Sequence, residues 1–153
     1  MFLYNSELWN VNKKLETKIN VYQRILLRKI LKIYYPYKIT NEELYKRTRE
    51  ENWSNTIRKR RLRWTGHLLR LDENAPASLA LRESLRQHGK KKRGNCKIWR
   101  HIVNEDLKSV NLSLEHDNIR TIAEDRDKWS VLIKQILEAK STTDDDVPVK
   151  AST

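Results

Sequence analysis

The side chains best suited to chemistry in this sequence are arginines and lysines, which gather in two blocks. The blocks span residues 58–70 and 86–100, and neither contains an acidic residue. Guanidinium and ammonium groups bind phosphate oxygens with an affinity that depends strongly on salt and little on base sequence. The blocks therefore predict a surface for nucleic acid. Its candidate contacts are Arg58, Lys59, Arg60, Arg61, Arg63, Lys90, Lys91, Lys92 and Arg93.

Acidic pairs are the second candidate chemistry, because two carboxylates can hold Mg²⁺ for phosphodiester cleavage. Glu105 and Asp106 form one pair, and residues 124–127 hold another. Both lie among basic residues on predicted helices, where a solvated, ion-paired face is the better interpretation. Residues 144–146 fall in a predicted tail, which does not supply the rigid geometry that a metal site needs. A nuclease that uses the first two groups is kept as an alternative hypothesis.

Cysteine and histidine are too few and too scattered to predict a metal site. Cys96 is the single cysteine, and the four histidines are widely spaced, whereas structural zinc needs paired ligands at short spacing. One cysteine excludes an intrachain disulfide and fits an intracellular, reducing compartment. Residues 90–93 would also suit a nuclear localisation signal. No apolar run approaches the ~20 residues of a membrane span, so no membrane partner is expected.

Helices must position the basic blocks, because apolar residues recur at steps of three, four and seven. We expect an all-α fold of about six helices in an irregular array. A low apolar share of 38% against 34% charged residues predicts a thin core. Residues 141–153 lack periodicity and predict a disordered tail. The expected helices span about 11–33, 40–48, 53–71, 76–87, 95–110 and 113–139.

Local signals within these helices add four expectations. Thr40 and Glu43 form a capping box at a helix start. Gly66 costs helix stability, so close approach of another helix is expected there. Trp64 and Trp99 flank the basic blocks, but their helical spacing favours the core over base stacking. A stripe on the first helix is expected to face the core; it comprises Leu15, Ile19, Tyr22, Leu26, Ile30 and Ile33.

Several stretches, in the same order, resemble the region that follows the catalytic palm in endonuclease–reverse transcriptases of non-LTR (LINE-type) retrotransposons. The most specific is residues 57–71 (IRKRRLRWTGHLLRL), which is similar to that family's IRKRRLRWLGHVLRM. Residues 3–9 (LYNSELW) resemble LYGSETW, residues 22–24 and 27–31 resemble FQRRCLRRIL, and residues 39–44 resemble TNEEL. Residues 91–100, 105–108 and 123–129 resemble RGRPKxTWR, EDLK and AQDRxxW.

The resemblance implies that this chain is a carboxy-terminal helical fragment. The polymerase palm and the endonuclease of the parent, an RNA-directed DNA polymerase expected to use Mg²⁺, would lie upstream. The fragment itself is expected to hold no polymerase or endonuclease active site and no cofactor. Its N-terminal half (1–74) would be thumb-like, and its C-terminal half (75–140) would carry the basic loop. Asn95 and Cys96 replace the family's Arg-Pro, so the loop geometry is expected to differ.

Two partners follow from the same resemblance. RNA template or target DNA is expected on the basic surfaces, and the upstream reverse-transcriptase domains are expected as the protein partner. Met1 falls inside a family motif, which is expected of a truncated or decayed copy. The alternative function is a non-enzymatic interaction module that docks on the upstream domains, with its charge serving solubility.

Overall fold

The computed structural model describes residues 2–86, 99–116 and 118–144, and the regular structure in these ranges is entirely helical. The predicted all-α class is confirmed. The described part of the chain has one more α-helix than the six expected, and none of its helices is long and apolar enough to cross a membrane. The elements are η1 (Ser6–Leu8), α1 (Lys13–Ile30), α2 (Asn41–Thr48), α3 (Trp53–Arg70), α4 (Pro76–Arg86), α5 (Trp99–Leu107), η2 (Lys108–Val110), α6 (Asn118–Glu124) and α7 (Arg126–Asp144).

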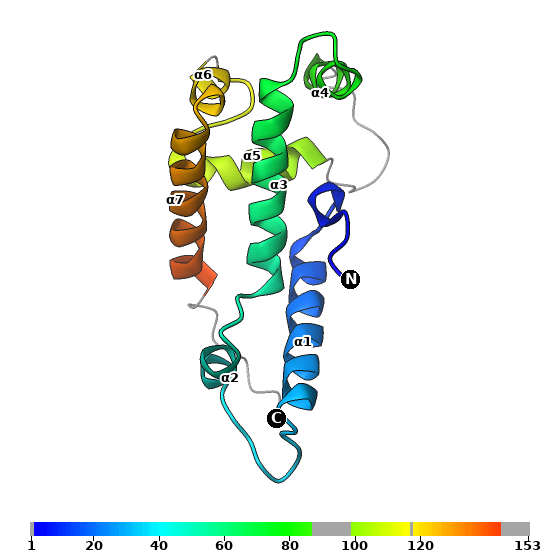
Figure 1. Cartoon of the computed structure of the whole chain (residues 1–153), viewed down its shortest axis with the longest axis vertical. Coiled ribbons are helices and arrows are strands. Elements are labelled where there is room, and N and C mark those ends of the chain that lie inside the picture. Colours follow the sequence, from blue (N-terminus) through cyan, green and yellow to red (C-terminus); the bar gives the residue numbers. More distant parts are fainter. Residues whose placement is uncertain (1, 87–98, 117, 145–153) are drawn as a thin grey trace.

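Helix α3 is the centre of the molecule. It runs lengthwise between α1 and α7, and α5 crosses it (Figure 1). Its Leu62 belongs to the larger core cluster, with Val103 and Leu107 of α5 and with α6 and α7. Its Ile57 belongs to a smaller cluster, with Val11 and Ile19. Since α3 contributes to both clusters, the two predicted halves share this helix.

Two amide side chains of α1 complete the N-terminus of α3. The first backbone N–H groups of a helix have no partner within it. The Trp53 N–H donates to Gln23 Oε1 at 2.9 Å, and the Ser54 N–H donates to Asn20 Oδ1 at 3.1 Å. Gln23 also donates to the Glu51 carbonyl at 2.8 Å. A polar pair on α1 therefore fixes where α3 starts.

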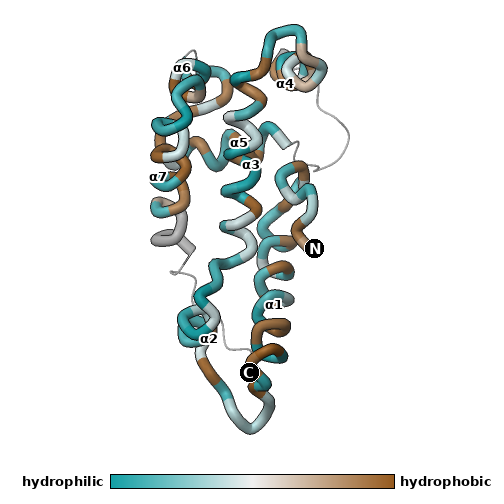
Figure 2. The backbone as a smooth tube through the Cα atoms, in the orientation of Figure 1, coloured by the Kyte–Doolittle hydropathy of each residue, from teal (hydrophilic) through white to brown (hydrophobic). Residues whose placement is uncertain are grey.

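This polar contact also explains why the predicted apolar stripe of α1 is wrong in part. Ile19 is buried as expected, but Leu15, Tyr22 and Ile30 are 41, 45 and 72% exposed. The buried face of α1 instead includes Gln23. The tube of α1 includes hydrophobic stretches (Figure 2), and several of its apolar side chains are thus exposed.

The close approach predicted at Gly66 is confirmed. A Cβ atom at Gly66 would lie 2.2 Å from Nε1 of Trp129 on α7. The same indole N–H donates to the Leu62 carbonyl at 3.0 Å. Gly66 is therefore the position that lets the Trp129 ring lie flush on α3.

The single helix predicted for residues 113–139 is wrong, because the chain breaks into α6 and α7 at Asp125. Asp125 Oδ1 accepts from the N–H groups of Asp127 and Lys128 at 3.0 and 3.1 Å, as an N-cap does. The predicted tail also starts too early, since α7 continues through residues 141–144. Residues 145–153 lie outside the described part.

The predicted start of α2 is confirmed on its side-chain half. Thr40 Oγ1 accepts from the Glu43 N–H at 3.2 Å. The Glu43 carboxylate pairs with Arg47 at 2.7 Å, one turn further along the helix. The second half of the predicted capping box is therefore replaced by an exposed ion pair within α2.

Candidate nucleic-acid interface

Two of the nine predicted contacts lie inside the molecule. Arg58 is 5% exposed and Arg61 is 1% exposed. Both donate to the buried carboxylate of Asp106: Arg58 Nε to Oδ1 at 3.1 Å, and Arg61 Nε and an Nη to Oδ2 at 3.1 and 2.6 Å. In the folded chain, therefore, neither guanidinium group is available at the surface to a phosphate.

A charge balance explains why two arginines can be buried here. Glu16 of α1 reaches an Nη of Arg58 at 3.4 Å, and Asn55 accepts from the other at 3.0 Å. Two guanidinium groups thus meet two carboxylates, as buried charges require. The sequence contained one signal, because Asp106 falls on the apolar stripe of α5. The interpretation of Asp106 as a solvated residue is wrong.

The outward side of α3 carries the remaining predicted cations of the first block. Arg60 and Arg63 are exposed, and Lys59 is partly exposed. Sequence reasoning did not include His67, which is exposed one turn beyond Arg63. Arg60, Arg63, Trp64 and His67 follow the i, i+3, i+4, i+7 spacing of one helix face. We call these four residues the α3 ridge.

The α3 ridge borders a hollow that could take an anion. Its volume is about 330 Å³, and it is lined by the ridge together with Glu7 of η1. The rings of Trp64 and His67 lie 5.2 Å apart, centroid to centroid. The hollow therefore joins cations to an aromatic surface, with one carboxylate at its edge.

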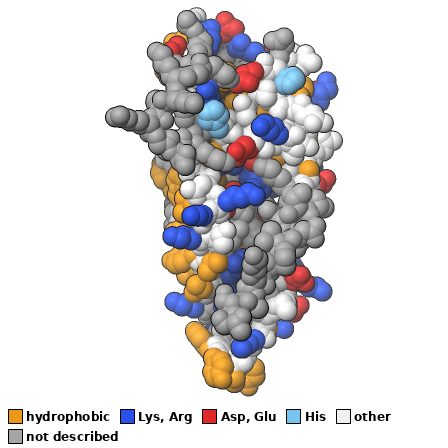
Figure 3. Space-filling model, turned by 180° about the vertical axis from the view of Figure 1, so that it is seen from behind, with side chains coloured by type: hydrophobic (Ala, Val, Ile, Leu, Met, Phe, Trp, Pro, Cys, Tyr) orange, Lys and Arg blue, Asp and Glu red, His pale blue; other side chains and the backbone are white. Residues whose placement is uncertain are grey.

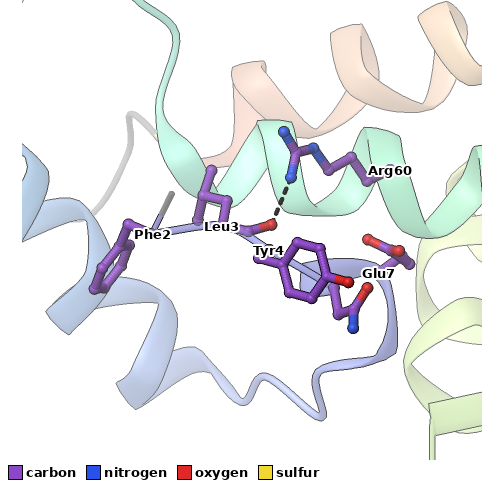
Figure 4. A pocket seen from close by; sticks show the side chains of 6 residues that line it. Phe2, Leu3, Tyr4, Glu7 and Arg60 are labelled. Atoms are coloured by element: carbon purple, nitrogen blue, oxygen red, sulfur yellow. Dashed lines mark hydrogen bonds between the residues drawn. The ribbon is translucent and has the colours of Figure 1, made fainter.

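Arg60 is held in place by the N-terminal segment. One Nη of Arg60 donates to the Leu3 carbonyl at 2.5 Å (Figure 4). Together with Tyr4 and Glu7, these residues line a second hollow of about 510 Å³. Arg60 thus lies between two hollows with its guanidinium restrained, which lowers the entropy cost of holding a phosphate.

The opposite flank of α3 has mixed charge. Lys59 and Arg63 line a hollow of about 290 Å³ with Lys134 of α7, but Glu51 and Glu138 line it too. Carboxylates oppose phosphate binding, so this flank is the weaker anion site. Residues 90–93 of the second basic block lie outside the described residues.

The carboxylates considered for a nuclease have structural roles. Both oxygens of Asp106 accept hydrogen bonds from arginine, and Asp125 caps α7. The backbone N–H of Lys128, with the Lys128 ammonium, lowers the pKa of Asp125 below its ordinary value. Glu105 is exposed. Asp106 and Asp125 thus serve the fold through different contacts, and Glu105 alone of the three is exposed.

Trp64 and Trp99 differ in their surroundings. Trp99 packs against the larger core cluster, as expected. Its indole N–H donates to the Glu7 carbonyl at 2.9 Å. Trp64 is partly exposed and lines hollows on both of its sides. The expectation that both rings serve the core thus holds for Trp99 alone.

Similarity to known proteins adds nothing to this geometry. Comparison of the chain with protein-family models, with curated proteins and with solved structures finds no match. The function proposed below therefore rests on the residues, on their placement and on the resemblance of short motifs.

Proposed function

We propose that this chain is a nucleic-acid-binding helical module, the carboxy-terminal portion of a non-LTR retrotransposon reverse transcriptase beyond its palm. The observation that carries the proposal is the α3 ridge, where exposed cations stand in a row on one rigid helix. The ridge lies in residues 57–71, the stretch with the most specific resemblance. In this proposal, polymerase and endonuclease chemistry belongs to the upstream domains, and this chain holds RNA template or target DNA.

The dimensions of the ridge suit a phosphate backbone. Arg60 and His67 are seven residues apart, or about 10 Å along the helix axis. Phosphates of one strand follow one another every ~3.4 Å along a duplex axis. The ridge can therefore contact a few consecutive phosphates, and the net charge of +12 draws a polyanion towards it.

A salt series on binding tests the proposal. Replacing Arg60 and Arg63 together with Ala should weaken binding to duplex DNA and lower the log–log salt slope by about 1.8, or ~0.9 per phosphate contact. The measurement is fluorescence anisotropy of a labelled duplex at several salt concentrations. The matched control replaces Lys13 and Lys18, exposed on α1, and removes the same charge. Equal salt slopes for the two variants would show that the α3 ridge contributes no more to binding than any other pair of exposed cations.

One observation favours a second candidate function, docking on the upstream protein domains. The end of α1 and the segment that joins it to α2 expose apolar side chains: Ile30 is 72%, Tyr35 87% and Tyr37 80% exposed. Figure 3 shows hydrophobic side chains gathered at the lower end of the molecule, where Figure 1 places this segment. Exposed apolar patches of this kind mark interaction surfaces. The two functions use different residues and are compatible.

A further inference from the structure

Trp64 lies at the boundary between two hollows of different chemistry. On one side is the cationic hollow of the α3 ridge. On the other is an apolar hollow of about 300 Å³ between η1, α3, α4 and α5, lined by residues that include Leu8, Leu68, Leu81 and Trp99. A hollow of this volume is at the lower end of the range for small-molecule sites. The two hollows share Trp64.

From this juxtaposition we propose that the chain binds single-stranded nucleic acid by holding a phosphate at the α3 ridge and an unpaired base in the apolar hollow, against Trp64. The inference rests on the proposed function and names its substrate class. Stacking of a base on an aromatic ring tolerates any sequence, since every base has a π-face. A cationic groove combined with aromatic platforms is typical of single-strand binding.

The walls of the apolar hollow are fixed by hydrogen bonds. The Trp99 indole N–H donates to the Glu7 carbonyl at 2.9 Å, which ties α5 to η1. Arg100 donates to the carbonyl groups of Ser84 and Leu85 at the end of α4. Both tethers hold α4, α5 and η1 around the opening. A preformed site costs less entropy to fill than one that must order on binding.

Base pairing decides which nucleic acid can use both hollows. In a duplex the bases are paired and stacked, and extracting one costs unstacking energy. A duplex can reach the α3 ridge with its phosphates but leaves the apolar hollow empty. A single strand can place a phosphate and a base at once. The inference therefore predicts a preference for single strands that depends on the base as well as the phosphate.

Three matched probes separate the base from the phosphate. They are a short labelled pyrimidine single strand, an abasic single strand of the same length and a duplex of that sequence. The wild-type chain should bind the pyrimidine strand roughly tenfold more tightly than the abasic strand, as expected for the loss of one stacked base. Trp64→Leu keeps an apolar side chain but removes the π-face, and it should abolish this difference while leaving the salt slope unchanged. Ala80→Phe, which adds a ring at the wall of the apolar hollow, should do the same.

Each result bears on one level of the proposal. Equal affinity of the wild type for pyrimidine and abasic strands would overturn the base-binding inference and leave phosphate binding intact. A preference that survives both variants would also overturn it. Absence of binding to all three probes would overturn the proposed function itself. Circular dichroism melting of each variant shows whether the fold is kept, and Arg60→Ala with Arg63→Ala should weaken all three probes together.

Discussion

At the residue scale, the Arg58–Asp106–Arg61 cluster shows that a count of basic residues does not identify the exposed ones. Arginines in one uninterrupted basic block differ in role because the helix directs them to different sides. Arg58 and Arg61 face α5, whereas Arg60 and Arg63 face solvent. The sequence shows the block and its helical period, but the buried carboxylate that divides the block lies 45 and 48 residues away.

The stability of that cluster can be tested at Asp106. Asp106→Asn removes the charge that both buried guanidinium groups need, and breaking a buried pair in this way costs about 3–5 kcal/mol. The free energy of unfolding, measured in urea, should fall by this amount. Glu105→Gln, at the exposed neighbouring position, is the control and should change it little. An unchanged Asp106→Asn variant would mean that water enters the cluster.

A second residue-scale prediction concerns Gly66. Alanine is normally better than glycine inside a helix by about 1 kcal/mol. Here its Cβ would meet the Trp129 ring at 2.2 Å, and overpacking of this kind costs about 1–3 kcal/mol. Gly66→Ala should therefore lower the thermal midpoint. A higher midpoint would show that α7 moves aside freely.

At the element scale, the sequence predicts helix starts that carry a local signal, but it does not predict the break between α6 and α7. Thr40 and Pro76 mark the starts of α2 and α4 close to where the structure has them. The prediction of the buried face of α1 is wrong in part, because apolar periodicity identifies a buried face only when that face packs against apolar residues. Instead, α1 turns the amide side chains of Asn20 and Gln23 towards α3, where they accept hydrogen bonds from its first N–H groups. The break at Asp125 interrupts an apolar stripe that continues on both sides.

The cap at Asp125 makes a pH prediction. Hydrogen bonds from Lys128 lower the pKa of Asp125 in the folded chain below the ordinary value of 3.8. A lowered pKa means that the ionised form stabilises the fold; this contribution is complete above the ordinary value and is lost as the pH falls through the lowered one. Asp125→Ala should therefore lower the thermal midpoint at neutral pH. The difference from wild type should shrink as the pH falls below 3.8, and a constant difference would assign the loss to helix propensity instead.

At the scale of the whole molecule, the sequence predicts which basic residues form the candidate site. It does not predict which of them are exposed or which hollows they line. The basic blocks are visible in the sequence, and all five candidate residues of the first block lie on α3. Which of them reach solvent depends on the packing of α1, α5 and α7 around that helix. The same packing creates the two hollows beside Trp64. No pattern in the sequence predicts these hollows.

The exposed apolar end of the molecule makes a prediction at this scale. Ile30, Tyr35 and Tyr37 should drive self-association of the purified chain at high concentration, because no described residue covers them. Replacing Ile30 with Lys and Tyr35 with Ser should yield a monomer by sedimentation velocity. Nucleic-acid binding should persist, since the α3 ridge is unchanged. Self-association that persists in this variant would show that the chain associates through another surface.

The Arg58–Asp106–Arg61 cluster also has a consequence for synthesis. During translation Arg58 and Arg61 leave the ribosome 48 and 45 residues before the carboxylate that neutralises them. Until Asp106 has been made, neither Arg58 nor Arg61 has this partner. The nascent chain therefore exposes two cations that the folded chain buries, and the synthesis of α5 is the event that allows their burial.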